Sequence, residues 1–387
     1  MRNSIQVEAA VRQRYSKGAK QKVQALCCPV SYNAHYLKII PSEIIERDYG
    51  CGDPSRYVRE GETVLDLGSG GGKICYIAAQ VVGRKGRVMG VDMNDDMLAL
   101  SRKYQPHMAR KLGYGNVEFH KGKIQDLALD LDVFAEYLHK KPVKNATDWL
   151  AAQSHADGLR KTRPMIAECT VDVVVSNCVL NLVQNSDKKQ LFSEIHRVLK
   201  RGGRAVISDI VSDEDVPAEL QNNPELWSGC ISGSFREDLF LKAFEEAGFY
   251  GVRILERDDK PWRTVKGIEF RSVTVEAFKG KEGLCLERNQ AVIYKGPFKE
   301  VLDDDGHRIK RGVRQAVCDK TFQIYTREPY RSHFEPVLPR KEIPLATAGE
   351  FHCGRTEPRH PRETKGLNYK ATTATNNNGS SCGPGCC

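Results

Sequence analysis

Residues 63–73 read TVLDLGSGGGK, and this stretch decides the fold. The short apolar run TVLDL predicts a buried strand that ends near Asp66, and KICYIAAQVV at 73–82 predicts a helix. Between them lie Gly68, Gly70 and Gly72. Glycines at such a junction permit a tight turn and let the backbone approach a ligand, with the first amides of the helix facing it. The stretch therefore predicts a nucleotide-type site where a strand meets a helix.

A second strand strengthens this interpretation. RVMGVD at 87–92 ends in Asp92, twenty residues after Gly72, and Met93 follows it. A carboxylate in that place can accept hydrogen bonds from both hydroxyls of a ribose. Asp92 and Met93 are therefore candidates for the same nucleoside site as Asp66 and the glycines.

The pattern around these motifs predicts a doubly wound, Rossmann-like α/β domain at residues 61–212. Five short runs rich in β-branched residues predict strands: TVLDL, RVMGVD, VEFHKG, VDVVVSN and RAVISDI. Helical stretches alternate with them, and the polar segment at 130–165 predicts a helical surface insertion.

Four further regions complete the expected organisation. Residues 1–60 form an N-terminal segment that begins with a basic amphipathic helix, and residues 213–280 form an α+β module. Residues 281–340 form a small β-rich extension with a turn at DDDGH and β-like runs that include QAVCDKTFQIYTR. Residues 341–387 form a flexible tail that ends in Cys382, Cys386 and Cys387.

Composition limits the function classes. The chain has 387 residues, of which 40% are apolar, with 59 Lys+Arg against 50 Asp+Glu. The excess of positive charge is scattered, so no nucleic-acid partner is predicted. No apolar run reaches the ~18 residues of a membrane span, and no secretory signal opens the chain. We expect a cytoplasmic monomer without a membrane partner, in which the 13 cysteines serve mainly as ligands or redox groups.

Three of the cysteines lie in distinctive contexts. Cys51 lies in YGCG, Cys178 in SNCVLNL directly after the predicted strand VDVVV, and Cys230 in LWSGC. The carboxyl end of a strand is where a doubly wound fold presents functional groups. None of the three belongs to a C-x-x-C pair, so a zinc ribbon is not predicted. For Cys75, Cys169 and Cys285 we expect the ordinary role of a small buried hydrophobe.

The pattern D-x-G-x-G-x-G resembles that of the class I S-adenosylmethionine-dependent methyltransferases rather than the dinucleotide pattern, over residues 61–211. The combination of YGCG, SNCVLNL and W-x-x-C resembles the arsenite methyltransferases, over residues 26–278. This resemblance implies S-adenosylmethionine as cofactor. Asp66 would lie near the methionine end of the cofactor, and Asp92 would hold its ribose. Tyr49 would stack on the cofactor.

The same resemblance implies roles for the cysteines. Cys178 and Cys230 would bind trivalent arsenic, and Cys51 would take part in binding or redox cycling. An upstream cysteine, Cys27 or Cys28, would complete the set and form a disulfide with Cys51, which a thiol system such as glutathione or thioredoxin would reduce. The tail cysteines could capture arsenic and deliver it.

The chemistry of arsenic agrees with these residue types. Trivalent arsenic is thiophilic, so thiolates suit it, and its lone pair can attack a sulfonium methyl without a general base. Two alternatives stay open from the sequence: a methyltransferase for a small organic substrate, or a thiol-rich metal-binding or redox-sensing protein without turnover.

Overall fold

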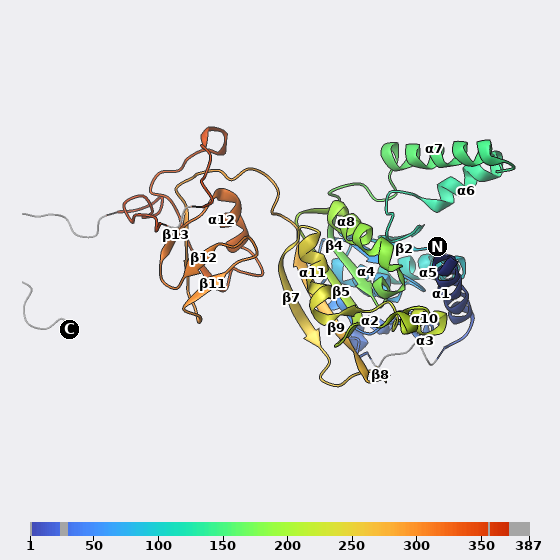
Figure 1. Cartoon of the computed structure of the whole chain (residues 1–387). Coiled ribbons are helices and arrows are strands. Elements are labelled where there is room, and N and C mark those ends of the chain that lie inside the picture. Colours follow the sequence, from blue (N-terminus) through green and yellow to red (C-terminus); the bar gives the residue numbers. More distant parts are fainter. Residues whose placement is uncertain (1, 24–29, 355–356, 371–387) are drawn as a thin grey trace, which may run out of the picture. The chain divides into compact units, whose positions relative to one another are not determined.

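The computed structural model describes residues 2–23, 30–354 and 357–370, and it divides the chain into two compact units, Met1–Gly280 and Lys281–Cys387 (Figure 1). Cys27, Cys28 and the three tail cysteines lie outside the described residues.

The first unit is built on one mixed sheet in the order β3-β2-β1-β4-β5-β9-β7, with β6 beside β5 and β8 beside β9. The five strands expected from the sequence are confirmed and run parallel to their neighbours, whereas β9 is antiparallel to β5. The strands are β1 (Thr63–Leu67), β2 (Arg87–Asp92), β3 (Val117–Lys121), β4 (Val171–Asn177), β5 (Leu199–Ser212), β6 (Phe235–Arg236), β7 (Tyr250–Arg257), β8 (Arg263–Val265) and β9 (Ile268–Phe278).

Helices cover both faces of this sheet, as the doubly wound pattern predicts. Alternate residues of β1 enter different cores: Val64 packs with residues of α4 and α5, and Leu65 with residues of α8 and α11. The sheet is therefore buried on both sides, which explains its runs of β-branched residues. The helices are α1 (Arg2–Lys20), α2 (Ala34–Leu37), α3 (Ser42–Glu46), α4 (Lys73–Val82), α5 (Asp95–Leu112), α6 (Leu131–Lys140), α7 (Ala146–Thr162), α8 (Lys188–Val198), α9 (Ala218–Gln221), α10 (Pro224–Ser228) and α11 (Glu237–Glu246).

Two expected segments have clear positions in this unit. The basic N-terminal helix is α1, and its Val7 and Val11 pack against Trp227 near α10. The polar insertion forms α6 and α7, which lie above the sheet in Figure 1. Asn145 caps α7 by accepting a hydrogen bond from the Asp148 amide at 2.9 Å, so the insertion has a well-defined helix start.

Residues 213–280 do not form a separate module beside the sheet. Their longest strand, β9, pairs with β5 from Arg204–Phe278 to Ser212–Phe270, and β7 pairs with β9 in turn. A long antiparallel ladder satisfies the backbone groups of β5 that would otherwise form an open edge. The expected arsenic-binding region is therefore part of the first unit.

The second unit has a three-stranded sheet in the order β13-β10-β14 and a hairpin of β11 and β12. The expected turn at DDDGH closes this hairpin, and the Gly306 amide donates to the Asp303 carbonyl at 3.0 Å. The elements are β10 (Ala291–Tyr294), β11 (Glu300–Leu302), β12 (Arg308–Lys310), β13 (Arg314–Ala316), α12 (Asp319–Tyr325) and β14 (Phe334–Val337).

Two expectations for this unit were wrong. The run at 315–327 was expected to be β-like, but residues 319–325 form α12, because the Cys318 sulfur caps the helix by accepting a hydrogen bond from the Thr321 amide at 3.4 Å. The flexible tail was expected from residue 341, yet Phe351 is buried against Ala316 and Cys318. Part of the expected tail thus completes the core of this unit.

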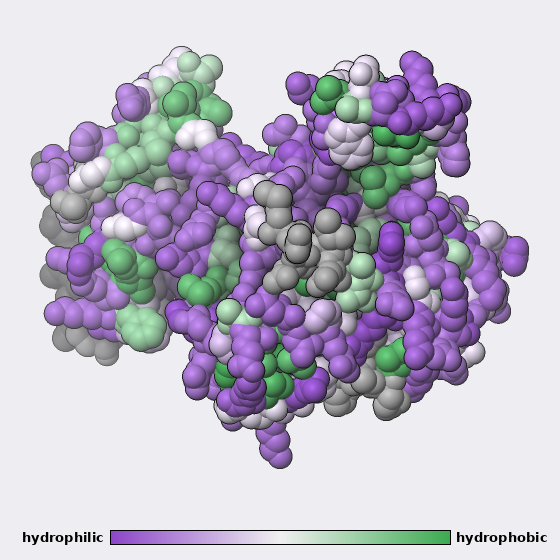
Figure 2. All heavy atoms as spheres, turned by 45° about the vertical axis from the view of Figure 1, so that its right-hand side comes forward, coloured by the Kyte–Doolittle hydropathy of each residue, from purple (hydrophilic) through white to green (hydrophobic). Residues whose placement is uncertain are grey.

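Within the described residues, no helix is both long and apolar enough to cross a lipid bilayer. On the face seen in Figure 2, hydrophilic residues predominate and hydrophobic residues form scattered patches.

Candidate functional site

The glycine-rich turn after β1 has the backbone that the sequence predicts. Gly68, Gly70 and Gly72 have φ values of 69°, 50° and 89°, in the left-handed region that side chains disfavour. A Cβ on Gly72 would lie 2.8 Å from the Phe119 ring, and one on Gly68 would overlap the Val179 side chain. Gly72 is the N-cap of α4. Side chains other than that of glycine would therefore be disfavoured at these three positions.

Asp92 at the end of β2 faces this turn. Its carboxylate accepts hydrogen bonds from the Gly70 amide at 2.9 Å and the Asn94 amide at 2.8 Å. Burial raises the pKa of Asp92, and these backbone bonds oppose the rise. The neighbouring Asn94 caps α5 and also donates to the Arg12 carbonyl of α1 at 3.0 Å. Strand β2 is thus joined to α1 next to the glycines.

A pocket lies between the glycine turn and α1. Its wall includes Gly68, Asp92 and Met93 from the predicted set, and Val179 and Leu182 from the segment after β4. The α1 residues in its wall are Glu8, Val11, Arg12 and Tyr15.

The sequence analysis missed the contribution of α1, which it treated only as a basic amphipathic helix. The four residues have the spacing i, i+3, i+4 and i+7, so they share one helical face. Two of them, Glu8 and Arg12, are charged although they lie beside the apolar Val11. A charged pair on an otherwise apolar face is the signal that could have identified this face as a ligand wall.

Asp66 and Tyr49 do not line this pocket. Asp66 is only 2% exposed and accepts a hydrogen bond from the Cys75 thiol at 3.3 Å; burial raises its pKa to about 8. The Tyr49 hydroxyl contacts the Gly18 carbonyl at 3.1 Å, and its ring lies edge-on to Tyr15 with centroids 6.2 Å apart. Tyr49 thus packs against the end of α1 and contacts Tyr15, which itself lines the pocket.

The structure brings together the three cysteines that were singled out. Cys51 and Cys178 form a disulfide, and Cys230 lies beside it. The Cys230 thiol donates to the Cys178 carbonyl at 3.1 Å. All three belong to one buried cluster with Ile210 and Phe270. Segments that are far apart in the sequence therefore meet at the carboxyl end of β4.

Asn177, the last residue of β4, fixes the Cys51 loop. Its side-chain oxygen accepts from the amides of Cys51 at 2.9 Å and Gly52 at 3.1 Å, and its amide group donates to the Gly52 carbonyl at 2.8 Å. A Cβ on Gly50 would overlap the Asn177 amide. The glycines of YGCG thus allow the chain to approach this clamp closely, and the Cys51 side chain is buried.

Cys178 and Cys230 both have φ of 61°, a conformation that non-glycine residues seldom adopt. Such positions cost about 1–3 kcal/mol each and concentrate at functional sites. The surrounding bonds hold them there: the Cys178 amide donates to the Ser208 carbonyl at 2.8 Å, and the Cys230 amide to the Trp227 carbonyl at 3.0 Å.

Asp209 of β5 is a second residue that the sequence analysis missed. A carboxylate oxygen lies within 4.8 Å of the sulfurs of Cys51 and Cys178. Burial raises the pKa of Asp209 to about 7, and burial of the nearby Lys188 lowers its pKa to about 8. An acidic residue inside the apolar strand RAVISDI was the available signal, because a buried charge needs a reason.

The cysteine cluster and the pocket adjoin each other. Tyr15 lines the pocket, and its hydroxyl lies 3.8 Å from the Cys230 sulfur. Val179, the neighbour of Cys178, lines the pocket as well. Arg14 joins α1 to the Cys230 segment by donating to the Glu225 carbonyl at 2.9 Å. A ligand in the pocket can therefore face a ligand held by the sulfurs.

The cysteine expectations have different outcomes. The expected disulfide of Cys51 with Cys27 or Cys28 stays a prediction, because Cys27 and Cys28 lie outside the described residues. In this structure the Cys51 sulfur is bonded to that of Cys178, and Asn177 holds the Cys51 loop at the end of β4. Cys75 is buried as expected, whereas Cys169 is exposed. Cys285 is half-buried and lies beside other sulfurs, as described below.

Comparisons with known proteins agree with this geometry. A family model described as a methyltransferase domain matches residues 59–147 and 160–248, and a domain of unknown function matches residues 281–369. The arsenite methyltransferase of Aquipseudomonas alcaligenes is 32% identical over 80% of this chain and 84% of its own length. That of Mus musculus is 30% identical over 79% of this chain and 74% of its own length.

A solved structure is also similar. The arsenic (III) S-adenosylmethionine methyltransferase from Chlamydomonas reinhardtii has 28% sequence identity and a TM-score of 0.55, and the match covers 84% of this chain and all of that chain. Fold, cysteine site and relatives lead to one conclusion: the chain belongs to the arsenite methyltransferase family.

Proposed function

We propose that the protein transfers methyl groups from S-adenosylmethionine to trivalent arsenic held by its cysteine thiolates. The observation that supports this most is the contact between the two halves of the site: Tyr15 and Val179 line the pocket and adjoin Cys230 and Cys178. The family of the chain supports the same reaction.

The pocket suits S-adenosylmethionine. Asp92 offers a carboxylate at the end of β2 that can accept from ribose hydroxyls, and the missing side chain of Gly68 leaves room beside the backbone. Met93, Gly70 and Gly72 would shape the same wall. Asp66, which is bonded to Cys75 of α4, would support the glycine turn from behind. Tyr49 would hold Tyr15 in place in the pocket wall by packing against its ring.

The residues of the chain explain how arsenic would be bound and aligned for methylation. Cys178 and Cys230, as thiolates, bind the soft arsenic centre, with Cys51 as the third ligand for the unmethylated form. Bound S-adenosylmethionine supplies an electrophilic sulfonium methyl, to which the arsenic lone pair forms the new As–C bond while S-adenosylhomocysteine leaves. The residues contribute mainly alignment, because aligned groups reach effective molarities of ~10⁵ M or more.

A redox step follows from the same cysteines. Gaining a methyl cation oxidises arsenic from the trivalent to the pentavalent state. Two of the arsenic-bound thiolates can return it to the trivalent state: their two As–S bonds break, one S–S bond forms, and arsenic gains the two electrons. Cys51 and Cys178 are the pair that lies within bonding distance. A cellular thiol such as glutathione or thioredoxin would then reduce the disulfide, by exchange through a mixed disulfide.

Two alternatives from the sequence remain to be tested by experiment: methylation of a small organic substrate, and binding without turnover. Purified protein is incubated with arsenite, S-adenosylmethionine and either glutathione or reduced thioredoxin, and the products are separated by mass-resolved chromatography. We expect methylated arsenicals. Their absence, while S-adenosylmethionine still binds, would contradict the proposal.

A further inference from the structure

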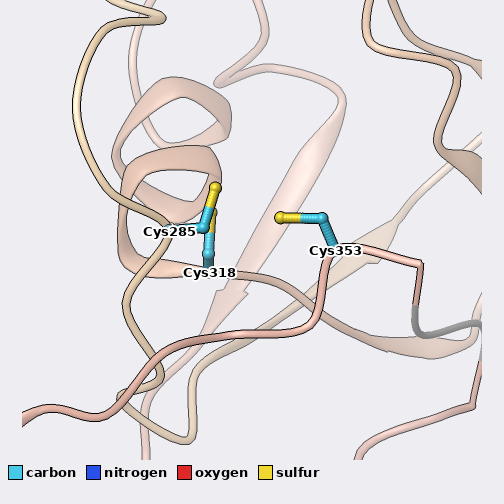
Figure 3. Close-up of side chains that lie close together, drawn as sticks. All are labelled: Cys285, Cys318 and Cys353. Carbon is cyan, nitrogen blue, oxygen red and sulfur yellow. The ribbon is translucent and has the colours of Figure 1, made fainter.

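The second unit contains a cluster of three cysteines that the proposed reaction does not use. The sulfurs of Cys285, Cys318 and Cys353 lie within 4.8 Å of one another, and all three cysteines are free. In Figure 3 the Cys353 side chain points across a gap toward the other two sulfurs. The three residues come from well-separated parts of the unit: a segment before β10, the residue before α12, and a loop near the end of the described chain.

Backbone hydrogen bonds hold these three segments together. The Phe351 amide donates to the Cys285 carbonyl at 2.8 Å, and the Asp319 amide donates to the Leu286 carbonyl at 2.9 Å. Phe351 and Cys318 also share a small buried core against which Cys285 packs. The sulfurs are therefore brought together by the fold, and a ligand would find them already arranged.

The cluster also provides for thiolates. Burial raises the pKa of Cys285, but hydrogen bonding to Cys353 and the charge of Lys320 outweigh this, so its pKa is lowered. The Cys318 sulfur accepts a hydrogen bond from the Thr321 amide at 3.4 Å. The pKa of Cys353 is raised to about 12, by desolvation and by its hydrogen bond with Cys285. The neighbours of Cys285 thus favour its thiolate, and a bound ion would deprotonate the other two thiols.

The distances fit one shared ion. A thiolate–metal bond such as Zn–S is about 2.3 Å, so two sulfurs on one ion lie at most about 4.6 Å apart. The cluster needs only a small contraction to reach this. Cys318 and Cys353 also line a pocket of about 240 Å³, so an ion has a path to them.

We propose that Cys285, Cys318 and Cys353 form a second site for trivalent arsenic, outside the catalytic cluster. Three sulfurs complete the coordination of trivalent arsenic, whereas structural zinc takes four ligands. Among the described residues, the sulfur cluster contains no fourth candidate ligand within 4.8 Å.

Binding balances without a redox step. Arsenous acid exchanges three As–O bonds for three As–S bonds, and each thiol proton leaves with a hydroxide as water. The site goes beyond the proposed function, because no step of the proposed methyl transfer uses these three cysteines.

The test measures arsenic retained by the reduced full-length chain. Wild type, C318S and C353S are incubated with arsenite and no S-adenosylmethionine, desalted in the presence of glutathione, and analysed by elemental mass spectrometry. The matched control is C169S, since Cys169 is an exposed free cysteine of the first unit. We expect C318S and C353S each to retain one arsenic fewer per chain than wild type and C169S, and X-ray absorption of a C178S/C230S chain to show three sulfurs per arsenic.

Equal retention by wild type, C318S and C353S would overturn the inference. So would zinc in the purified chain at one equivalent that is lost in C353S, because the cluster would then be a structural zinc site. Cys353 is exposed, so C353S should keep the fold, which thermal unfolding checks if C318S is unstable. Failure here leaves the methylation assay unaffected, because no step of this test uses the methyl donor.

Discussion

The two cysteine clusters differ in what surrounds their sulfurs. Cys51, Cys178 and Cys230 are buried at the carboxyl end of a parallel strand, next to a pocket lined by the glycine turn. Cys285, Cys318 and Cys353 lie on loops and at a helix start in the other unit, and their exposure ranges from buried to exposed. Both sets can supply three thiolates to a soft ion. The first set adjoins the pocket that we propose for the methyl donor.

Backbone conformation separates the clusters further. Cys178 and Cys230 have left-handed backbones, whereas Cys318, the N-cap of α12, has an extended backbone with φ of −70°. Strain is retained where the surroundings enforce it, and at the first cluster these surroundings are Asn177, Ser208 and Trp227. We interpret the strained cysteines of the first cluster as positioned to align bound arsenic with a methyl group. The second cluster, without this strain at Cys318, needs only to bind its ion.

The largest expected effect comes from the strained cysteines. C178S and C230S should each reduce methylation of arsenite by at least ~10³-fold, because a hydroxyl is harder and far less acidic than a thiol and cannot hold a soft centre as a thiolate does. Calorimetry should find binding of S-adenosylmethionine nearly unchanged. Retained activity in either variant would remove that cysteine from the site and break the contrast between the clusters.

A smaller and more selective effect is expected for Cys51. C51S should lose activity on arsenite by ~10²-fold but keep most of it on methylarsenite. Trivalent arsenic takes three ligands, and each methyl replaces one thiolate, so Cys178 and Cys230 suffice after the first transfer. Initial single-turnover rates on both substrates measure this, because they exclude recycling. Equal loss on both would mean that Cys51 stays bound throughout or supports the fold.

Much of the first unit could be predicted because local patterns and tertiary structure agree there. The strands β1 to β5 are apolar runs that the sheet buries on both faces, so burial reinforces propensity. Agreement failed at residues 319–325, where aromatic and β-branched residues favour a strand but the Cys318 cap starts a helix. It failed also at Phe351, because a single apolar residue among prolines and charges gives no periodic signal.

The site was predictable where a motif is contiguous. YGCG and SNCVLNL identified Cys51 and Cys178, but their disulfide depends on Asn177, which joins segments more than a hundred residues apart. The role of Tyr15 and the approach of Asp209 depend on how α1 and β5 pack, which no local pattern records. The three sulfurs of the second unit have no short spacing at all, so only the folded chain brings them together.

The third effect concerns the pocket and tests the proposal that the first cluster adjoins a methyl donor. D92A should weaken binding of S-adenosylmethionine by ~10- to 100-fold, because hydrogen bonds to a charged acceptor contribute ~1.5–3 kcal/mol each. Calorimetry of the arsenic-free protein measures this affinity. The control is D95A, since Asp95 is a nearby carboxylate at the start of α5 that pairs with Lys121 instead. Unchanged affinity would show that Asp92 is not the ribose acceptor.

The smallest effect tests whether the second cluster holds a prepared thiolate. K320M removes the positive charge that helps to lower the pKa of Cys285, so that pKa should rise. A thiol with a higher pKa is deprotonated only at higher pH, so the midpoint of Cys285 alkylation, followed by peptide mass spectrometry, should move to higher pH. K281M is the control, because Lys281 pairs with Asp305 in the same unit and is not among the groups that shift Cys285. An unchanged midpoint would mean that the neighbouring sulfurs lower the pKa of Cys285 without help from Lys320. The two clusters would then differ in backbone conformation and in their neighbours, but not in how their thiolates form.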